Sequence, residues 1–118
     1  MREQLNKLES VEDLNDALHE STERPILLFK HSLTCSISMR AFNELQSYLE
    51  HADSRISYML INVQTARAVS EQAASKLRVT HQSPQAILVR NGREVWSASH
   101  SEITDSALAE AIRQAVAK

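Results

Sequence analysis

The sequence predicts an α/β fold in which a four-stranded mixed sheet carries helices on both faces, with an extra helix at the N-terminus. Three observations lead to this expectation. Apolar runs of strand length alternate along the chain with segments in which apolar residues recur at helical spacing. The run at residues 25–31 does not alternate with polar residues, which is typical of a central strand covered on both faces. Asn91 and Gly92 separate two further apolar runs, and Asn-Gly is a strong signal for a hairpin.

The N-terminal half of the chain supplies a helix, a strand and a second helix. The first helix is expected at residues 10–21, because Ser10 is a candidate N-cap and the apolar residues that follow it share one face. Pro25 begins the strand at residues 25–31. The second helix is expected at residues 36–49, where the apolar residues at helical spacing are Ile37, Ala41, Phe42, Leu45, Tyr48 and Leu49.

The C-terminal half supplies a strand, a helix, a hairpin and a last helix. The predicted ranges are 55–63 for the strand, 66–77 for the helix, 86–89 and 95–98 for the hairpin strands, and 103–118 for the last helix. Thr104 is the expected N-cap of that last helix. A helix between the first two strands predicts a parallel pair with a right-handed crossover, and the hairpin adds antiparallel strands. We expect one domain that covers residues 1–118.

Composition and charge exclude several classes of protein. Of the 118 residues 42% are apolar, which is enough for one core, and acids and bases are interspersed with a formal net charge of −2. The chain has no basic stripe of the kind that binds nucleic acid. No apolar run approaches the roughly 18–20 residues that a membrane helix needs, and residues 1–14 lack the apolar stretch of a signal peptide. We therefore expect a soluble, cytoplasmic protein with neither nucleic-acid nor membrane partners.

Cys35 is the only cysteine, and it stands between the strand at residues 25–31 and the helix that begins at Ser36. A single cysteine cannot form an internal disulfide, which agrees with a reducing compartment, and it rules out a Cys-x-x-Cys couple. A lone cysteine of a cytosolic protein is often a small buried hydrophobe. The strand-to-helix position, together with the proline-containing element "SPQAILV" further along, favours a reactive thiol instead.

The position of Cys35 gives a physical reason for reactivity. The thiolate is the nucleophile, and a free thiol with a pKa of about 8.5 is only slightly ionised at neutral pH. The unpaired N–H groups and the partial positive charge of a helix N-terminus stabilise an anion. Ser36 adds one N–H beside the thiol, and the Ser38 hydroxyl, three residues on, is placed to reach the sulfur. Lys30 and His31 end the preceding strand and are candidates to add positive charge, although alternation lets only one of them face the site; His31 also fits a structural role.

Two features resemble the thioredoxin superfamily. One is the thiol that follows the first core strand at the start of a helix. The other is "KLRVTHQSPQAILVRNG", which has the order helix end, loop, proline, apolar strand and glycine turn. Over nearly the whole chain the sequence is more closely similar to the monothiol bacilliredoxin (YtxJ-like) family. The shared marks are "FKHS" before the cysteine, Cys-x-Ile-Ser, "SPQAILV", and "VWSASH" followed by "IT". The family usually has proline directly after the cysteine, where this chain has Ser36.

The resemblance implies a thioredoxin-like fold and a thiol-disulfide oxidoreductase that removes a bacillithiol-like thiol from protein mixed disulfides. Cys35 would be the catalytic residue. Pro84 would follow a cis peptide bond and lie against the thiol, which leaves the Ser83 backbone free to pair with substrate; Thr34 is the third expected substrate-binding residue. The implied partners are proteins S-thiolated on cysteine and the low-molecular-weight thiol itself, which acts as a co-substrate. No cofactor and no metal are expected.

The missing second cysteine shapes the expected mechanism, because Cys35 would keep the small thiol until a second external thiol releases it. Two alternatives stay open. Some Cys-x-x-Ser glutaredoxins carry an iron–sulfur cluster between two chains, and Cys35 and Ser38 have that spacing, although Ser36 and Ile37 replace the usual glycine and aromatic residue. The fold is also compatible with a non-catalytic interaction module. The five histidines show no metal-ligand spacing, which argues against a zinc site.

Overall fold

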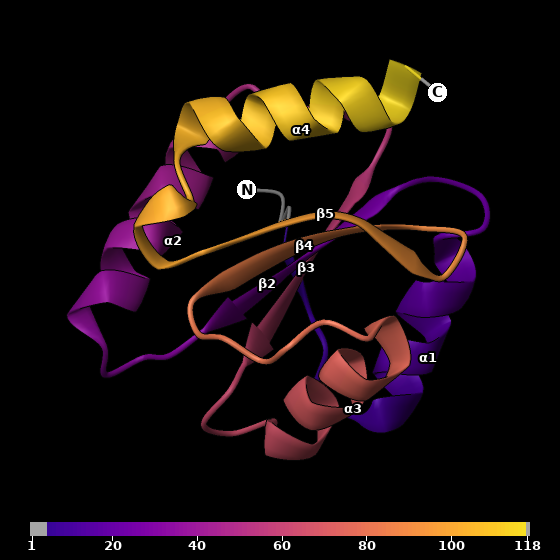
Figure 1. The fold of residues 1–118 in the computed structure, drawn as a ribbon, viewed down its shortest axis with the longest axis vertical. Coiled ribbons are helices and arrows are strands. Elements are labelled where there is room, and N and C mark those ends of the chain that lie inside the picture. Colours follow the sequence, from indigo (N-terminus) through magenta and orange to yellow (C-terminus); the bar gives the residue numbers. More distant parts are fainter. Residues whose placement is uncertain (1–4, 118) are drawn as a thin grey trace.

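The computed structural model of the protein describes residues 5–117, in which a five-stranded sheet of order β1-β3-β2-β4-β5 carries two helices on each face (Figure 1). The strand β2 is parallel to β3 and antiparallel to β4. The elements in chain order are β1 (Leu5–Lys7), α1 (Val11–Glu20), β2 (Ile26–His31), α2 (Ser36–Leu49), β3 (Ser57–Asn62), α3 (Arg67–Leu77), β4 (Gln85–Arg90), β5 (Arg93–Ser99), a 3-10 turn (His100–Glu102) and α4 (Asp105–Ala117).

The α/β class with a mixed sheet is confirmed, but the predicted number of four strands is wrong. The additional strand, β1, pairs in parallel with β3 at the edge of the sheet, with Leu5 opposite Tyr58. Its sequence, Leu-Asn-Lys, carries no alternating apolar pattern, and two of its three residues are exposed. Backbone hydrogen bonds to β3 hold such a strand, because they satisfy N–H and C=O groups that would otherwise be unpaired at the edge.

The local signals for the other elements are confirmed. Every residue of β2 is buried, as expected of a central strand. Ser10 caps α1 by accepting a hydrogen bond from the Asp13 N–H at 3.0 Å, and Thr104 Oγ1 accepts one from the Ala107 N–H at 3.1 Å at the start of α4. Asn91 and Gly92 have φ values of 54° and 72°, which are the positive values that a tight hairpin turn requires.

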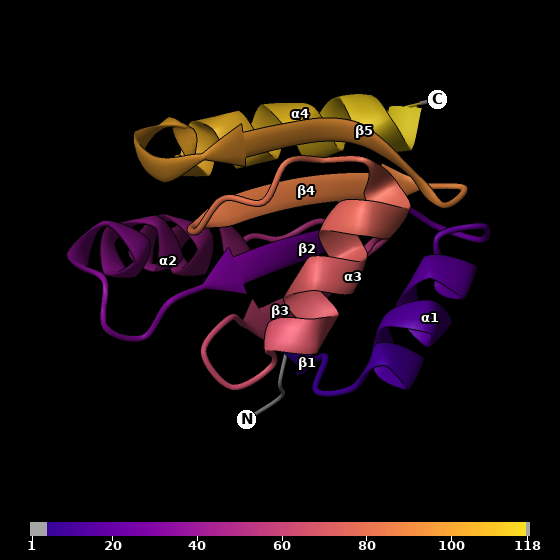
Figure 2. The same cartoon turned by 60° about the horizontal axis from the view of Figure 1, so that its bottom comes forward.

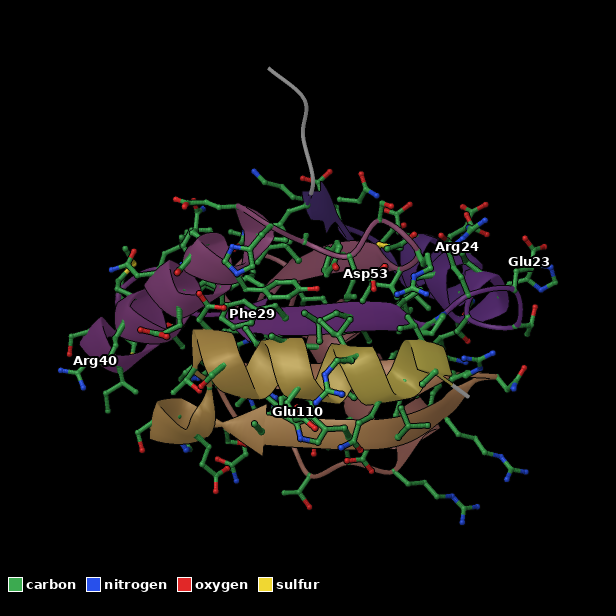
Figure 3. The ribbon with its side chains drawn as sticks, turned by 90° about the horizontal axis from the view of Figure 1, so that it is seen from above. Glu23, Arg24, Phe29, Arg40, Asp53 and Glu110 are labelled. Carbon is green, nitrogen blue, oxygen red and sulfur yellow. The ribbon has the colours of Figure 1, made fainter. Side chains whose placement is uncertain are left out.

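The core has two layers because successive side chains of β2 point to opposite faces of the sheet. Leu27 and Phe29 pack with residues of α2 and α4, and Figure 3 shows Phe29 extending from β2. Ile26 and Leu28 pack with residues of α1 and α3 on the other face. Charged side chains such as Arg40 extend outward (Figure 3). No helix within residues 5–117 has both the length and the apolar character needed to cross a membrane.

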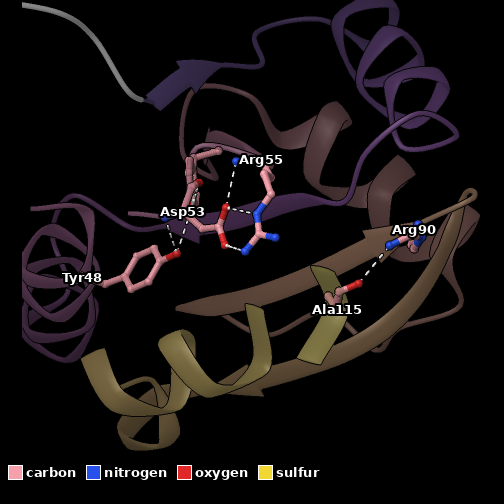
Figure 4. A network of polar contacts seen from close by, with 6 residues as sticks. Tyr48, Asp53, Arg55, Arg90 and Ala115 are labelled. Atoms are coloured by element: carbon pink, nitrogen blue, oxygen red, sulfur yellow. Dashed lines mark hydrogen bonds and ion pairs between the residues drawn. The ribbon is translucent and has the colours of Figure 1, made fainter. Parts of the chain in front are cut away.

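A polar network fixes the C-terminal end of α2 (Figure 4). The Tyr48 hydroxyl accepts a hydrogen bond from the Asp53 N–H at 3.1 Å and lies 2.8 Å from the Tyr58 hydroxyl. The Asp53 carboxylate is held by Arg55, whose Nε and Nη2 donate to it at 3.0 and 2.7 Å, and these hydrogen bonds lower the pKa of Asp53. Because this network anchors one end of α2, it helps to fix the position of the other end, where Cys35 lies.

Candidate active site

Three segments meet at one end of the sheet, the end at which the parallel strands β2 and β3 finish. The parallel strands β2 and β3 both end there, so the loops that lead to α2 and α3 begin side by side, and antiparallel β4 starts at the same edge (Figure 2). Lys30 of β2 pairs with Gln85 of β4. This register places Pro84, which precedes β4, beside His31 at the end of β2, and the Cys35 loop follows directly.

Cys35 occupies the N-cap position of α2 and is half-buried. Its carbonyl oxygen accepts a hydrogen bond from the Met39 N–H at 3.0 Å, and its thiol makes no capping hydrogen bond to the helix. The first turn of α2, which begins with the exposed Ser36, holds no acidic residue, whereas the first turn of α4 holds Asp105. The free N–H groups and positive end of α2 are therefore not offset by a carboxylate from its own first turn, and Cys35 lies at that end of the helix.

Ser38 and His31 form a buried pair below the loop that carries Cys35. Ser38 Oγ accepts a hydrogen bond from the Ser32 N–H at 2.9 Å and lies 2.7 Å from His31 Nδ1. The His31 ring stacks on Phe42, with ring centroids 4.7 Å apart and 16° between the planes. Burial lowers the pKa of His31, so its ring is neutral at neutral pH.

This arrangement differs from the roles expected of the two residues. Ser38 was predicted to reach the sulfur, but its hydroxyl hydrogen-bonds to His31 and to the loop backbone, with no hydrogen bond to Cys35 within residues 5–117. His31 was a candidate positive charge, and burial makes that charge unfavourable. In this structure both side chains hold the loop in place.

Replacing Ser38 by alanine is expected to lower the free energy of unfolding by about 1–3 kcal/mol, because the Ser32 N–H and His31 Nδ1 would be buried without their partner. Urea unfolding followed by circular dichroism measures the change. Ser75→Ala on the exposed side of α3 is the control and should change the free energy by less than about 0.5 kcal/mol. Equal effects of the two substitutions would contradict a bracing role for Ser38.

Lys30 lies on the other face of the sheet, so its expected role beside the thiol is wrong. Alternation along β2 points His31 toward α2 and Lys30 toward α3. Lys30 Nζ donates a hydrogen bond to the Ser70 carbonyl at 3.0 Å and lies 3.1 Å from His81 Nδ1. The side chain is fully buried, and burial lowers its pKa to about 8.

Replacing Lys30 by methionine is expected to stabilise the protein at pH 7, by about 1–3 kcal/mol, because an apolar side chain of similar length removes a buried charge. The pKa of Lys30 is about 8 in the folded protein and 10.5 ordinarily, so the unfolded chain binds this proton more tightly. The resulting cost is fully present below pH 8 and disappears as pH rises toward 10.5.

The measurement is urea unfolding of both proteins from pH 7 to 10.5. The difference between Lys30→Met and the natural protein should shrink across this range. Lys76→Met, at an exposed position of α3, is the matched control and should show no such difference at any pH. A Lys30→Met protein that is less stable at pH 7 would show that the hydrogen bonds of Lys30 outweigh the cost of its burial.

Thr34 is exposed, and its side chain is hydrogen-bonded to Gln64, a contact that was not predicted from the sequence. Gln64, just after β3, donates from Nε2 to Thr34 Oγ1 at 2.7 Å, and its Oε1 accepts from the Leu33 N–H at 2.8 Å. The two residues before Cys35 are therefore tied to the neighbouring loop. The predicted strand order could have indicated the contact between Gln64 and Thr34, because polar side chains that directly follow neighbouring parallel strands lie at the same end of a sheet.

Ser83 and Pro84 lie directly before β4, and the peptide bond between them is cis. Pro84 is buried, and its carbonyl accepts a hydrogen bond from the His100 N–H at 3.1 Å. The buried Gln85 side chain braces this loop by donating to the Thr80 carbonyl at 3.0 Å. Within residues 5–117 neither the buried Ser83 hydroxyl nor the Ser83 backbone has a hydrogen-bond partner.

The structure thus gathers most of the predicted site residues at one edge of the sheet. Cys35 and Ser36 lie at the tip of α2, Ser38 and His31 lie below them, and Ser83 and Pro84 lie on the neighbouring loop. Gln64 and His81 join this region without having been predicted there. Within residues 5–117 no three His, Cys, Asp or Glu side chains are placed to hold a metal ion.

Comparison with known proteins agrees with this geometry. The model of the family described as monothiol bacilliredoxin BrxC matches residues 6–108. A solved structure described as having a thioredoxin fold, and proposed to be an oxidoreductase, is 32% identical with a TM-score of 0.80; the match covers 92% of this chain and 93% of that one. Thioredoxin from Fasciola hepatica is 18% identical, with a TM-score of 0.73 and coverages of 93% and 98%. Thioredoxin Mala s 13 from Malassezia sympodialis is 10% identical, with a TM-score of 0.77 and coverages of 97% and 92%. The last two matches show the thioredoxin fold alone.

Proposed function

Because this chain belongs to the monothiol bacilliredoxin family of thiol redox proteins, we propose that it removes a low-molecular-weight thiol from S-thiolated proteins through Cys35. The observation that carries the proposal is the position of this thiol. Cys35 is accessible at the N-cap of α2, whose first turn offers free N–H groups and no acidic residue. Such a site favours the thiolate, which is the attacking species in thiol-disulfide exchange.

The reaction has two exchanges. The Cys35 thiolate attacks the small-thiol sulfur of a protein mixed disulfide, the protein sulfur leaves as a thiolate and takes up a proton, and Cys35 becomes linked to the small thiol. A second molecule of the small thiol, as its thiolate, then attacks the sulfur bound to Cys35. The products are the symmetrical disulfide of the small thiol and the regenerated Cys35 thiolate. One small thiol and one mixed disulfide are consumed, and one protein thiol and one small disulfide are formed.

The single cysteine supports this route over reduction of disulfides within proteins. The chain has no second thiol that could resolve an intermediate between Cys35 and a protein. The small thiol is therefore the co-substrate, and the family name supports a thiol of the bacillithiol class. Because free thiols persist in reducing compartments, we place this activity in the cytoplasm.

The surroundings of Cys35 support a protein as the second partner. Leu33, Ile37 and Met39 are 54%, 50% and 42% exposed, and they are three of the four large exposed hydrophobic residues within residues 5–117. Apolar side chains gathered around a site are typical of protein-binding surfaces. The backbone N–H and C=O groups of Ser83 are unpaired. They can form hydrogen bonds with an extended segment of that partner, which would then pair with the site as an added strand does.

The test is the formation of the expected intermediate. The native protein is incubated with bacillithiol disulfide or glutathione disulfide, quenched with acid and weighed by mass spectrometry at successive times. We expect one small-thiol adduct on Cys35, formed faster in the native protein than in urea-unfolded protein at the same pH. If the unfolded protein reacts at the same rate or faster, the fold does not activate Cys35 and the proposal fails.

A further inference from the structure

A groove lies between α4 and the hairpin that β4 and β5 form, and we call it the β5–α4 groove. It encloses about 120 Å³, and its apolar lining residues are Leu88, Val95, Trp96, Ala111 and Ala115. Strand β4 carries Gln85 at the end near Cys35, and Arg90 lines the groove roughly 17 Å further along the same strand. The groove is therefore directed toward the hairpin end of the sheet, away from the thiol.

A β-bulge turns two neighbouring side chains of β5 into this groove. Val89 pairs with Glu94 and Leu88 pairs with Trp96, so Val95 is the extra residue between them. Neighbouring residues of a regular strand face opposite sides of the sheet, whereas Val95 and Trp96 both line the groove. Val95 is 53% exposed, and of the four large hydrophobic residues that are exposed within residues 5–117 it alone lies outside the surroundings of the active site. The bulge thus places an apolar side chain at the mouth of the groove.

Two arginines at the hairpin end give the groove a positive charge. Arg90 lines it and donates one hydrogen bond, from Nη1 to the Ala115 carbonyl at 2.9 Å (Figure 4), so the guanidinium keeps further N–H groups to offer. Arg93 pairs with Arg90 across the hairpin, and directly opposed residues of two strands share a face, so Arg93 is on the groove side as well. Neither arginine has an ion-pair partner within the described residues 5–117.

The carboxylates of the neighbouring segments do not offset this charge. Glu94 is opposite Val89, which packs with the α1 and α3 side of the core, so Glu94 belongs to the other face of the sheet. Glu110 of α4, labelled in Figure 3, is held by Arg113 and Gln114. An apolar groove with two uncompensated cations is complementary to an apolar side chain that is flanked by carboxylates.

The size of the groove favours one side chain of a protein as its occupant. Sites for small molecules usually have volumes of about 300–1,000 Å³, whereas a cavity of about 150 Å³ holds a single benzene ring. At about 120 Å³ the groove suits one branched aliphatic side chain. A second copy of this chain fits poorly, because a two-fold contact brings identical patches together, and Arg90 and Arg93 would then face the same two arginines.

We propose that the β5–α4 groove is a docking site for a partner protein, which inserts one branched apolar side chain beside Trp96 and sets flanking carboxylates against Arg90 and Arg93. β5 is the outermost strand of the sheet, so an extended segment of the partner also finds backbone groups to pair with. Because the groove is directed away from Cys35, the docked protein leaves the thiol open. The docking site does not depend on the proposed exchange reaction.

The test uses Trp96, because it is the only tryptophan of the chain and lines the groove, so that its fluorescence reports on the occupant directly. The probe is the peptide acetyl-Glu-Asp-Ile-Asp-Glu-amide. One reference peptide has every acid replaced by its amide, and the other has alanine in place of isoleucine. Each peptide is titrated to millimolar concentration into the whole protein. We expect a saturable change in emission with the probe, and a half-saturating concentration about tenfold or more higher for each reference.

Two variants at exposed positions test the charge and the mouth of the groove. Val95→Asp should abolish binding of the probe, because the new carboxylate pairs with the arginines and repels the peptide. Arg93→Gln should raise the half-saturating concentration of the probe by about two- to fivefold and leave that of the amide reference unchanged. Both variants should keep the circular dichroism spectrum and the exchange rate at Cys35. Arg40→Gln, at an exposed position of α2 (Figure 3), is the matched control and should bind the probe as the natural protein does.

Unchanged Trp96 emission with the probe, or equal half-saturating concentrations for all three peptides, would overturn the inference. Equal effects of Arg40→Gln and Arg93→Gln would also overturn it, because overall charge and not the groove would then be responsible. A dimer in sedimentation, with Trp96 emission that depends on protein concentration alone, would show that a second copy covers the groove, and the proposed partner would be wrong. None of these outcomes bears on the proposed exchange, which is measured at Cys35.

Discussion

Replacing Cys35 by serine is expected to abolish the release of small thiols from protein mixed disulfides. The reaction needs a thiolate, the chain has no other sulfur nucleophile, and a serine hydroxyl does not exchange with disulfides. The rate in the presence of Cys35→Ser should equal that of the reaction without protein. The measurement is the recovery of a free thiol on an S-thiolated test protein, supplied with the small thiol as reductant.

The stability of this variant separates a chemical effect from a structural one. Cys35 is half-buried at the N-cap of α2 and its thiol caps no N–H group. Serine is among the preferred N-cap residues, so the free energy of unfolding should stay the same or rise by up to about 1 kcal/mol. An exchange rate that survives in a folded Cys35→Ser protein would exclude Cys35 as the nucleophile. If the natural protein itself reacts no faster than the reaction without protein, the non-catalytic interaction module is favoured.

Replacing Phe29 by alanine is expected to cost about 3–5 kcal/mol of unfolding free energy, the largest loss of stability that we predict. Phe29 is 0% exposed and packs in the core between the sheet and the helices α2 and α4 (Figure 3). Its ring centroid lies 6.1 Å from those of both His31 and Phe42, so the cavity would also loosen the stacked pair below the Cys35 loop.

Urea unfolding measures the loss of stability, and two controls bracket it. Phe29→Leu fills most of the volume and should cost clearly less than alanine. Leu33→Ala removes an exposed side chain and should change the free energy by about 0.5 kcal/mol or less. A cost below about 1.5 kcal/mol for Phe29→Ala would mean that the core collapses around the missing ring, in conflict with the dense packing of protein interiors.

The elements that the sequence predicted well are those with strong local signals. The four helices begin within one or two residues of their predicted starts, because Ser10, Thr104 and the apolar faces mark them. The central position of β2 followed from its unbroken apolar run. β1 was missed because only its backbone is needed for pairing with β3, and backbone groups leave no mark on the sequence.

The sequence could predict those residues of the candidate site that are recognisable by their residue type and their position relative to a predicted strand or helix. Cys35 and Pro84 are of this kind. The roles of Lys30 and His31 were not, because alternation shows only that they face opposite sides, and the packing of α2 and α3 decides which side each one faces. Gln64 and His81 were missed because their partners, Thr34 and Lys30, are 30 and 51 positions away in the sequence.

The side chains of the last two residues of β2 contact two separate sets of side chains, which lie on opposite faces of the sheet. His31 leads to Ser38 and Phe42, and Lys30 leads to Ser70 and His81. Neither set shares a side chain with the other, so the packing on one face can be altered with little effect on the other. Substitutions on opposite faces should therefore combine additively in their effects on the free energy of unfolding, so that one face can be redesigned while the other is kept.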